Sequence, residues 1–224
     1  MFKNLMQFWR GKDFLGQVLE EFRNMLDDSR TMFKGVCKKL IYAEDIGNLK
    51  DKIYHLDKKI NEVERDIRRR VIEHLAVQPS IDVPVSLILM SVVKDAERLG
   101  DYCKNLYEVS ELLDKPIDEA KYRELFGDTD KAVLDLFAET REAFVQSDEN
   151  KAAELWERER KIVKGCDAIL EKVAKSSLSV NEAVCFALMA RYFKRITAHL
   201  ANIGTSVIVP VSDLDYYDEK RAEA

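Results

Sequence analysis

The sequence predicts an all-α protein, and three observations carry this prediction. The 224 residues include only 8 Gly and 4 Pro, whereas strand-rich folds need many turns and therefore many such residues. Apolar residues recur at spacings of three and four along most of the chain, which is the period of an amphipathic helix. Charged residues make up 34% of the chain and apolar residues 46%, a mixture typical of helices with one exposed face and not of disorder.

Six helices are expected. In the first, apolar residues such as Val18 and Phe22 form one stripe. The turn QPSID, residues 78–82, separates the second helix from the third, and its Ser80 or Asp82 is expected to cap the third helix. The predicted ranges in chain order are 13–43, 49–77, 83–113, 117–146, 150–175 and 180–207.

Turn and capping residues set the later boundaries. The tripeptide DKP at 114–116 ends the third helix, and Asp118 is expected to help start the fourth. A break in the fourth helix is expected at Gly127-Asp128. Ser179 is the predicted N-cap of the sixth helix, with Glu182 three residues later as its capping-box partner.

Long helices must pack together to stay folded, so the chain is expected to form bundles. We expect two antiparallel three-helix bundles, residues 1–114 and 115–207, followed by a polar C-terminal tail, residues 208–224. An internal repeat supports this division, because a shift of 97 residues lays the third helix on the sixth. Under this shift Lys94 meets Arg191, Arg98 meets Arg195 and Asn105 meets Asn202.

Charge and cysteine usage narrow the class of protein. The net charge is −5, whereas a nucleic-acid binder is usually basic, so no nucleic-acid partner is expected. The cysteines are Cys37, Cys103, Cys166 and Cys185, and no two are closer than 19 residues. This spacing contains no CxxC motif, so we expect buried, reduced thiols in a reducing compartment.

Neither a membrane span nor a signal peptide is expected. The longest apolar-looking run, residues 86–93, is far shorter than the roughly 20 residues that cross a bilayer. The N-terminal stretch MFKNLMQFW has interspersed charges and no continuous apolar core. It is either an interfacial anchor or a segment that caps the bundle or packs on a second subunit. We therefore expect a soluble, cytoplasmic protein.

The third predicted helix contains an acidic motif, DAERLGD, at residues 95–101. Its Glu97 and Asp101 are four residues apart and therefore share one helix face. Two carboxylates held this close repel each other unless a cation or a proton lies between them. Gly100 within a helix costs roughly 1 kcal/mol relative to alanine, so it needs a structural reason, either a nearby ligand or a tight helix crossing.

The preceding helix offers a matching face, formed by Asp57, Asn61 and Glu64. Oxygen ligands from facing helices in a bundle hold cations such as Mg²⁺, Mn²⁺ or iron. The alternative is an ordinary charged surface, in which Lys94 and Arg98 neutralise the acids as salt bridges. The spacing leaves both interpretations open.

Enzymatic motifs do not appear. The three histidines, His55, His74 and His199, have no HExxH spacing and no companion cysteine. No GxxxxGK, GxGxxG or GxSxG motif occurs. No catalytic residue is therefore assigned, and the protein is not expected to be an enzyme.

Three elements in order carry a resemblance to a known family. They are DKKINEVE at residues 57–64, AVQPSID at 76–82 and KDAERLGDYCKNL at 94–106. Together they resemble the PhoU family of phosphate-signalling regulators. The stretch ARYFKRITAHLANI at 190–203 is similar to the second copy of the same unit, so the resemblance covers most of the chain.

The resemblance implies two PhoU-type three-helix bundles related by a pseudo-twofold axis. It also implies a cytoplasmic adaptor that forms homodimers or higher oligomers and restrains phosphate uptake. Its partners would be a membrane phosphate transporter, a sensor histidine kinase or both, and its contact with the inner membrane would be indirect. The leading hypothesis is therefore a non-enzymatic regulator. The alternatives are a carboxylate-ligated metalloprotein or metalloenzyme, and a purely structural dimerisation module.

Some family members bind metal ions through E/D-x-x-x-D motifs. By this pattern the metal ligands would be Asp57, Asn61, Glu97 and Asp101. The ion would be divalent or iron, with Mg, Mn, Fe, Zn and Ni not distinguished, and no other cofactor is expected. In the second copy the motif reads Lys194-x-x-x-Ala198, so a second metal site is expected to be lost.

Overall fold

The computed structural model describes residues 13–77 and 83–214, and within this part of the chain it is built of helices without strands. Three predictions lie outside the described residues. They concern the N-terminal stretch 1–12, the capping of the third helix by Ser80 or Asp82, and the tail beyond residue 214. No helix of the described part is both long and apolar enough to cross a bilayer.

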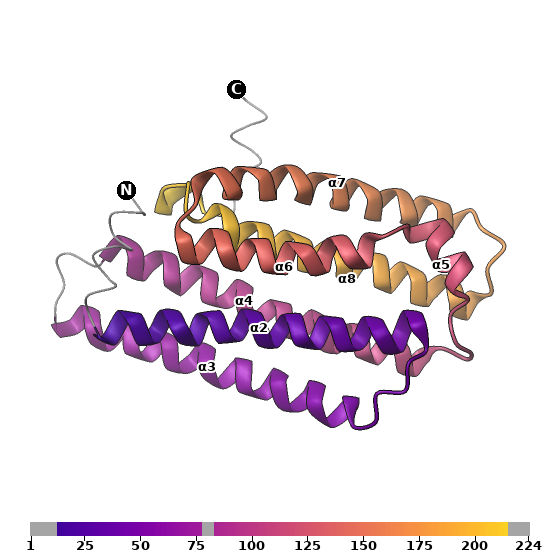
Figure 1. Cartoon of the computed structure of the whole chain (residues 1–224), viewed down its shortest axis with the longest axis horizontal. Helices are drawn as coiled ribbons and strands as arrows, with labels where there is room; N and C mark the ends of the chain where they lie inside the picture. The colour runs from indigo at the N-terminus through magenta and orange to yellow at the C-terminus, as the bar shows by residue number, and fades with distance from the viewer. Residues whose placement is uncertain (1–12, 78–82, 215–224) are drawn as a thin grey trace.

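The helices lie where the sequence predicts them, with each predicted end within two residues of the observed one (Figure 1). The predicted fourth helix is divided into α5 and α6 at Gly127-Asp128, where Gly127 has φ +57°. Only glycine adopts this left-handed conformation without strain. The elements are α2 (Asp13–Tyr42), α3 (Leu49–Val77), α4 (Val83–Leu112), α5 (Glu119–Phe126), α6 (Thr129–Gln146), α7 (Glu149–Ala174), α8 (Val180–Thr205) and the 3₁₀ turn η1 (Val211–Asp213).

Side-chain caps lie at the starts of α5, α7 and α8. Asp118 accepts hydrogen bonds from the backbone at the start of α5, and Asp148 does the same for α7. Ser179 and Glu182 form the predicted capping box at the start of α8. Each cap satisfies backbone N–H groups that have no partner within the helix.

Two antiparallel three-helix bundles form the fold, as the sequence predicts. Helices α2, α3 and α4 pack together in the first bundle, and α6, α7 and α8 pack together in the second. Helices α4 and α8 join the bundles along their length, and α2 also contacts α6 (Figure 1). The residue limits of the two bundles and the tail stay predictions.

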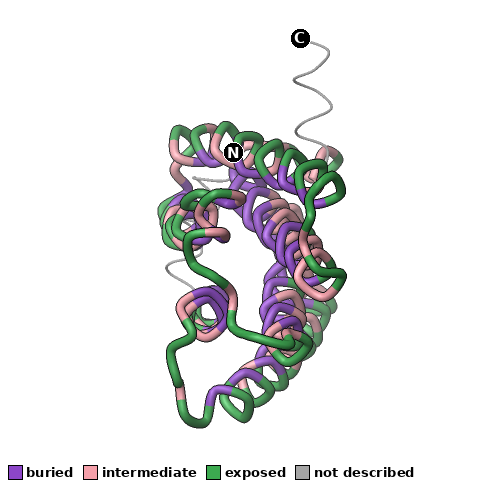
Figure 2. Tube along the Cα trace, turned by 90° about the vertical axis from the view of Figure 1, so that its right-hand side faces the viewer, coloured by how far each residue is buried: buried purple, intermediate pink, exposed green. Residues whose placement is uncertain are grey.

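One hydrophobic core runs through both bundles, and the buried side of each helix faces it (Figure 2). Phe33 of α2 packs against Phe137 of α6 and Phe193 of α8, with ring centroids 5.7 and 5.5 Å apart. All four cysteines are buried free thiols. Burial raises the pKa of Cys166 to about 12, so this thiol stays protonated and unreactive at neutral pH.

The repeat of 97 residues is visible in contacts between α4 and α8. Tyr102 and His199, which are equivalent under this shift, stack on each other with ring centroids 5.6 Å apart. The contact of His199 with Asp95 is equivalent to the contact of Tyr102 with Tyr192. A pair of contacts that exchange under the shift is what a pseudo-twofold axis through this interface produces.

Candidate functional site

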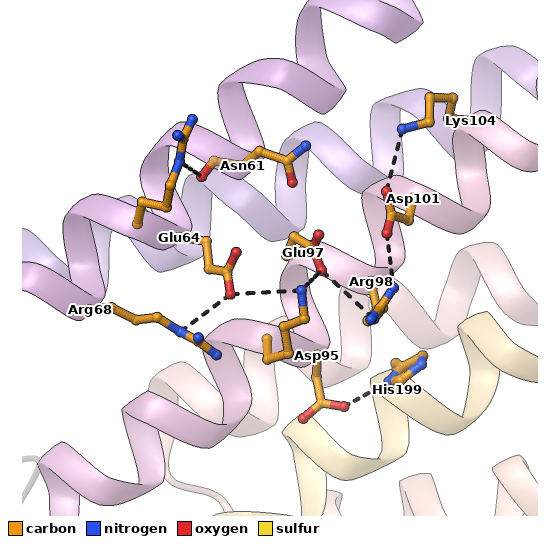
Figure 3. Close-up of polar contacts among 11 residues, drawn as sticks. Asn61, Glu64, Arg68, Asp95, Glu97, Arg98, Asp101, Lys104 and His199 are labelled. Atoms are coloured by element: carbon orange, nitrogen blue, oxygen red, sulfur yellow. Dashed lines mark hydrogen bonds and ion pairs between the residues drawn. The ribbon is translucent and has the colours of Figure 1, made fainter.

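The predicted oxygen-rich face lies where α3 and α4 run antiparallel (Figure 3). Asp57 and Glu64 of α3 and Glu97 of α4 are each only 8% exposed, while Asp101 is half-buried. A buried carboxylate is strongly destabilising unless it has a charged or hydrogen-bonding partner. The question for function is therefore which groups neutralise these acids.

Lys104 joins the two helices at one end of this face. Its Nζ donates to Asp57 Oδ2 at 2.7 Å and to Asp101 Oδ1 at 3.4 Å. Arg98 Nη1 donates to the other oxygen of Asp101 at 3.2 Å. Burial lowers the pKa of Lys104, but the hydrogen bond to Asp57 and the nearby carboxylates outweigh this and raise it above its ordinary value. Lys104 is therefore charged at neutral pH.

Lys94 has the same role at the other end of the face. Its Nζ lies 2.6 Å from Glu97 Oε2 and 3.9 Å from Glu64 Oε1. Arg68 Nε lies 3.2 Å from the same oxygen of Glu64, and Arg98 Nε lies 3.9 Å from Glu97 Oε2. The structure thus confirms the salt bridges of Lys94 and Arg98 that the sequence offered as the alternative to a ligand set.

The residues of this face fit an ion-pair network and, as placed, do not fit a metal centre. Within the described ranges, no group of three His, Cys, Asp or Glu side chains is placed to hold a metal ion. Asn61 lies on the same face, and its main-chain oxygen accepts from Arg65 Nε at 3.2 Å. The assignment of Asp57, Asn61, Glu97 and Asp101 as metal ligands stays a prediction.

Gly100 lies between the two lysines on α4, and its place in the helix is explained by a tight crossing. A Cβ added there would lie 3.1 Å from Cδ1 of Ile60 on α3, closer than an ordinary van der Waals contact. Of the two reasons offered from the sequence, a close helix or a ligand, the structure supports the close helix.

Comparison with known proteins shows the family of the chain. The family model of the PhoU domain matches residues 22–110 and 130–207. The chain belongs to the PhoU family. A curated relative, "Phosphate-specific transport system accessory protein PhoU homolog 1" of Thermotoga maritima, is 24% identical over 206 residues, with 85% of this chain and 79% of the relative covered.

Two solved PhoU structures share the fold. The phosphate transport system regulatory protein PhoU of Streptococcus pneumoniae superposes with a TM-score of 0.75 at 18% identity, over 86% of this chain and 92% of its own. PhoU of Pseudomonas aeruginosa superposes with a TM-score of 0.75 at 20% identity, over 87% of this chain and 95% of its own.

The second PhoU unit does not repeat the acidic face. At the equivalent positions Asp101 and Lys104 are replaced by Ala198 and Ala201, so the acid and its lysine are absent together. Lys194, the equivalent of Glu97, lies 2.7 Å from Asp167 of α7. The buried acidic network is therefore confined to the first of the two units.

A second polar site, at the junction of the two PhoU units, escaped the sequence analysis. Asp95 is only 7% exposed, and its Oδ1 lies 2.7 Å from His199 Nδ1 and 3.3 Å from Asn202 Nδ2. The contact joins residues 104 apart in the chain. The only available signal was the internal repeat, which lays His199 on Tyr102.

Proposed function

We propose that this chain is a non-enzymatic regulator of phosphate transport that acts by protein–protein contact. Its partner would be a membrane phosphate transporter, a sensor histidine kinase of the phosphate-starvation response, or both. The observation that carries the proposal is the match of the PhoU domain to both halves of the chain. The curated relative from Thermotoga maritima is named as an accessory protein of a phosphate-specific transport system.

The arrangement of the acidic face favours binding over catalysis. A carboxyl group that acts as a general acid or base must be able to reach the substrate. Asp57, Glu64 and Glu97 are instead buried and paired with basic side chains. The proposal also places the protein in the cytoplasm as a homodimer. Light scattering on the purified chain tests the dimer.

Affinity capture tests the proposed partner. The tagged chain is recovered from its native host after gentle solubilisation of the membranes, from cells grown in high and in low phosphate. We expect a phosphate transporter or its sensor kinase to be enriched over an unrelated helical protein with the same tag, to an extent that changes with phosphate. Recovery of neither protein in either condition would contradict the proposal.

A further inference from the structure

The most unusual feature of the α3–α4 face is that lysines stand between its acids. Each of two lysines on α4 forms ion pairs with two carboxylates. One carboxylate is three residues away on α4, and the other is on the facing helix α3. Lys94 lies between Glu97 and Glu64, and Lys104 lies between Asp101 and Asp57. In each case the ammonium lies where a cation shared by two helices would bind.

We propose that the ammonium groups of Lys94 and Lys104 permanently occupy the cation positions between the acids of α3 and α4, so that the first unit folds without a metal ion. This inference concerns the first unit alone and does not depend on the proposed function. On the acidic face, lysine ammonium groups of the chain itself would take the place of a bound metal ion.

The charge balance of the network supports the proposal. Four carboxylates, those of Asp57, Glu64, Glu97 and Asp101, meet four cationic side chains, those of Arg68, Lys94, Arg98 and Lys104. A divalent ion that displaced one ammonium group from this neutral network would leave one positive charge in excess, and an ion that entered without displacing it would leave two. Hard cations bind where carboxylate charge is left unbalanced.

The close approach of the helices supplies the geometry. Gly100 lies between the two lysine positions on α4, and Ile60 of α3 packs directly on it. Because the backbones approach closely at this point, a lysine on either side can reach a carboxylate of the facing helix. Removal of the ammonium groups would leave four carboxylates with two arginines, Arg68 and Arg98, as counterions. The unbalanced negative charge favours cation binding.

The second unit shows that Asp101 and its lysine vary together. Where the first unit has Asp101 and Lys104, the second has Ala198 and Ala201. The joint loss of Asp101 and Lys104 fits an ion pair, because neither charge is needed once the other is gone. At the other lysine position the base is kept as Arg191 while Glu97 becomes Lys194. A buried charge that loses its partner is strongly destabilising.

Metal analysis of the unmodified protein is the first arm of the test. The chain is dialysed against Mn²⁺ and, separately, Zn²⁺, then gel-filtered, and bound metal is measured by plasma mass spectrometry. We expect far less than one ion per chain, and no change in the midpoint of thermal unfolding when EDTA or Mn²⁺ is added. A stoichiometric ion that resists gel filtration, with a midpoint lowered by EDTA, would overturn the proposal.

The second arm removes the built-in cations. The variant Lys94→Met/Lys104→Met keeps unbranched side chains that are one heavy atom shorter and loses their charge. We expect its unfolding midpoint to fall below that of the unmodified chain and to rise by several degrees when Mn²⁺ is added, with bound Mn²⁺ after gel filtration. Lys39→Met is the matched control, because Lys39 also joins two helices but pairs with a single carboxylate, Glu111, at 2.6 Å.

A double variant that binds no more Mn²⁺ than the control would overturn the claim that the lysines occupy cation positions. Should the double variant fail to fold, Lys104→Gln replaces it, since the amide keeps a hydrogen-bond donor near Asp57 and Asp101. The same gain in Mn²⁺ binding is then expected at one position, and its absence counts against the proposal in the same way.

Discussion

A buried carboxylate and an imidazole form one of the contacts that connect the two PhoU units. Asp95 of α4 lies against His199 of α8, and both side chains are almost entirely removed from solvent, at 9% and 12% exposure. Tyr102 stacks on the imidazole from the other side. The contact therefore fixes the rotation of α8 about its own axis relative to α4.

Replacement of His199 by Phe tests this contact. Phe preserves an aromatic ring to stack on Tyr102 but leaves Asp95 with the longer hydrogen bond from Asn202 Nδ2, at 3.3 Å. We expect the free energy of unfolding to fall by about 1–3 kcal/mol, the cost of removing a hydrogen-bond partner from a buried carboxylate. Urea unfolding measures the change, and His55→Phe at an exposed site is the control. Equal losses in the two variants would contradict the role given to the pair.

At the residue scale, the sequence predicted which helix face the acids share, but it did not predict all of their ion-pair partners. The spacing of Glu97 and Asp101 correctly placed both acids on the face that meets α3, and Lys94 and Arg98 were correctly named as possible counterions. Lys104 was missed because its reach to Asp57 depends on the register of α3 against α4. No local spacing encodes this register.

At the scale of elements, the start of α8 contains an acid with a strongly shifted pKa. The hydrogen bond from Lys121 and the bonds to Ser179 lower the pKa of Glu182 to about 2. Lys121 comes from α5, so this ion pair, at 3.1 Å, also joins the start of the second bundle to its last helix. The capping box that the sequence predicted thus has a second, tertiary role.

This shift predicts a pH dependence with a definite sign. Because the folded-state pKa lies below the ordinary value of 4.5, the unfolded chain takes up the proton first as pH falls. The stabilisation from Glu182 is thus complete above about pH 4.5 and is lost as the pH falls toward 2. We expect the unfolding free energy of Glu182→Gln to decrease less than that of the unmodified chain across this range.

Chemical unfolding at a series of pH values measures the effect, with Glu124→Gln as the control because Glu124 is an exposed acid of the neighbouring helix α5. Gln can still accept the backbone hydrogen bond of the capping box, so the comparison isolates the charge. Parallel pH profiles for Glu182→Gln and the unmodified chain would show that the carboxylate contributes nothing.

Helix limits were the most predictable part of the structure. Turn residues and caps act through nearest neighbours in the chain, so Gly127 and Ser179 mark their boundaries from the sequence alone. The packing of one helix on another is harder to predict, because it depends on side chains far apart in the sequence. The contact of Ile60 with Gly100 is an example, because the glycine suggested a close approach but could not name the residue.

At the scale of the whole molecule, the two PhoU units share a fold and differ in their charges. The shared fold follows from the apolar stripes, which recur in both halves and bury one continuous core. The acidic network follows from particular residues and is present in the first unit alone. A repeat can therefore be recognised by its core even where the polar network between its helices has diverged.

The proposal that the chain regulates phosphate transport by restraining uptake is tested most directly by the initial rate of labelled phosphate uptake. Host cells that lack the protein are compared, in phosphate-rich medium, with cells in which the chain has been restored and with an empty-vector control. The account predicts faster uptake without the protein and a return to the original rate when it is restored. Equal uptake in all three strains would contradict the account.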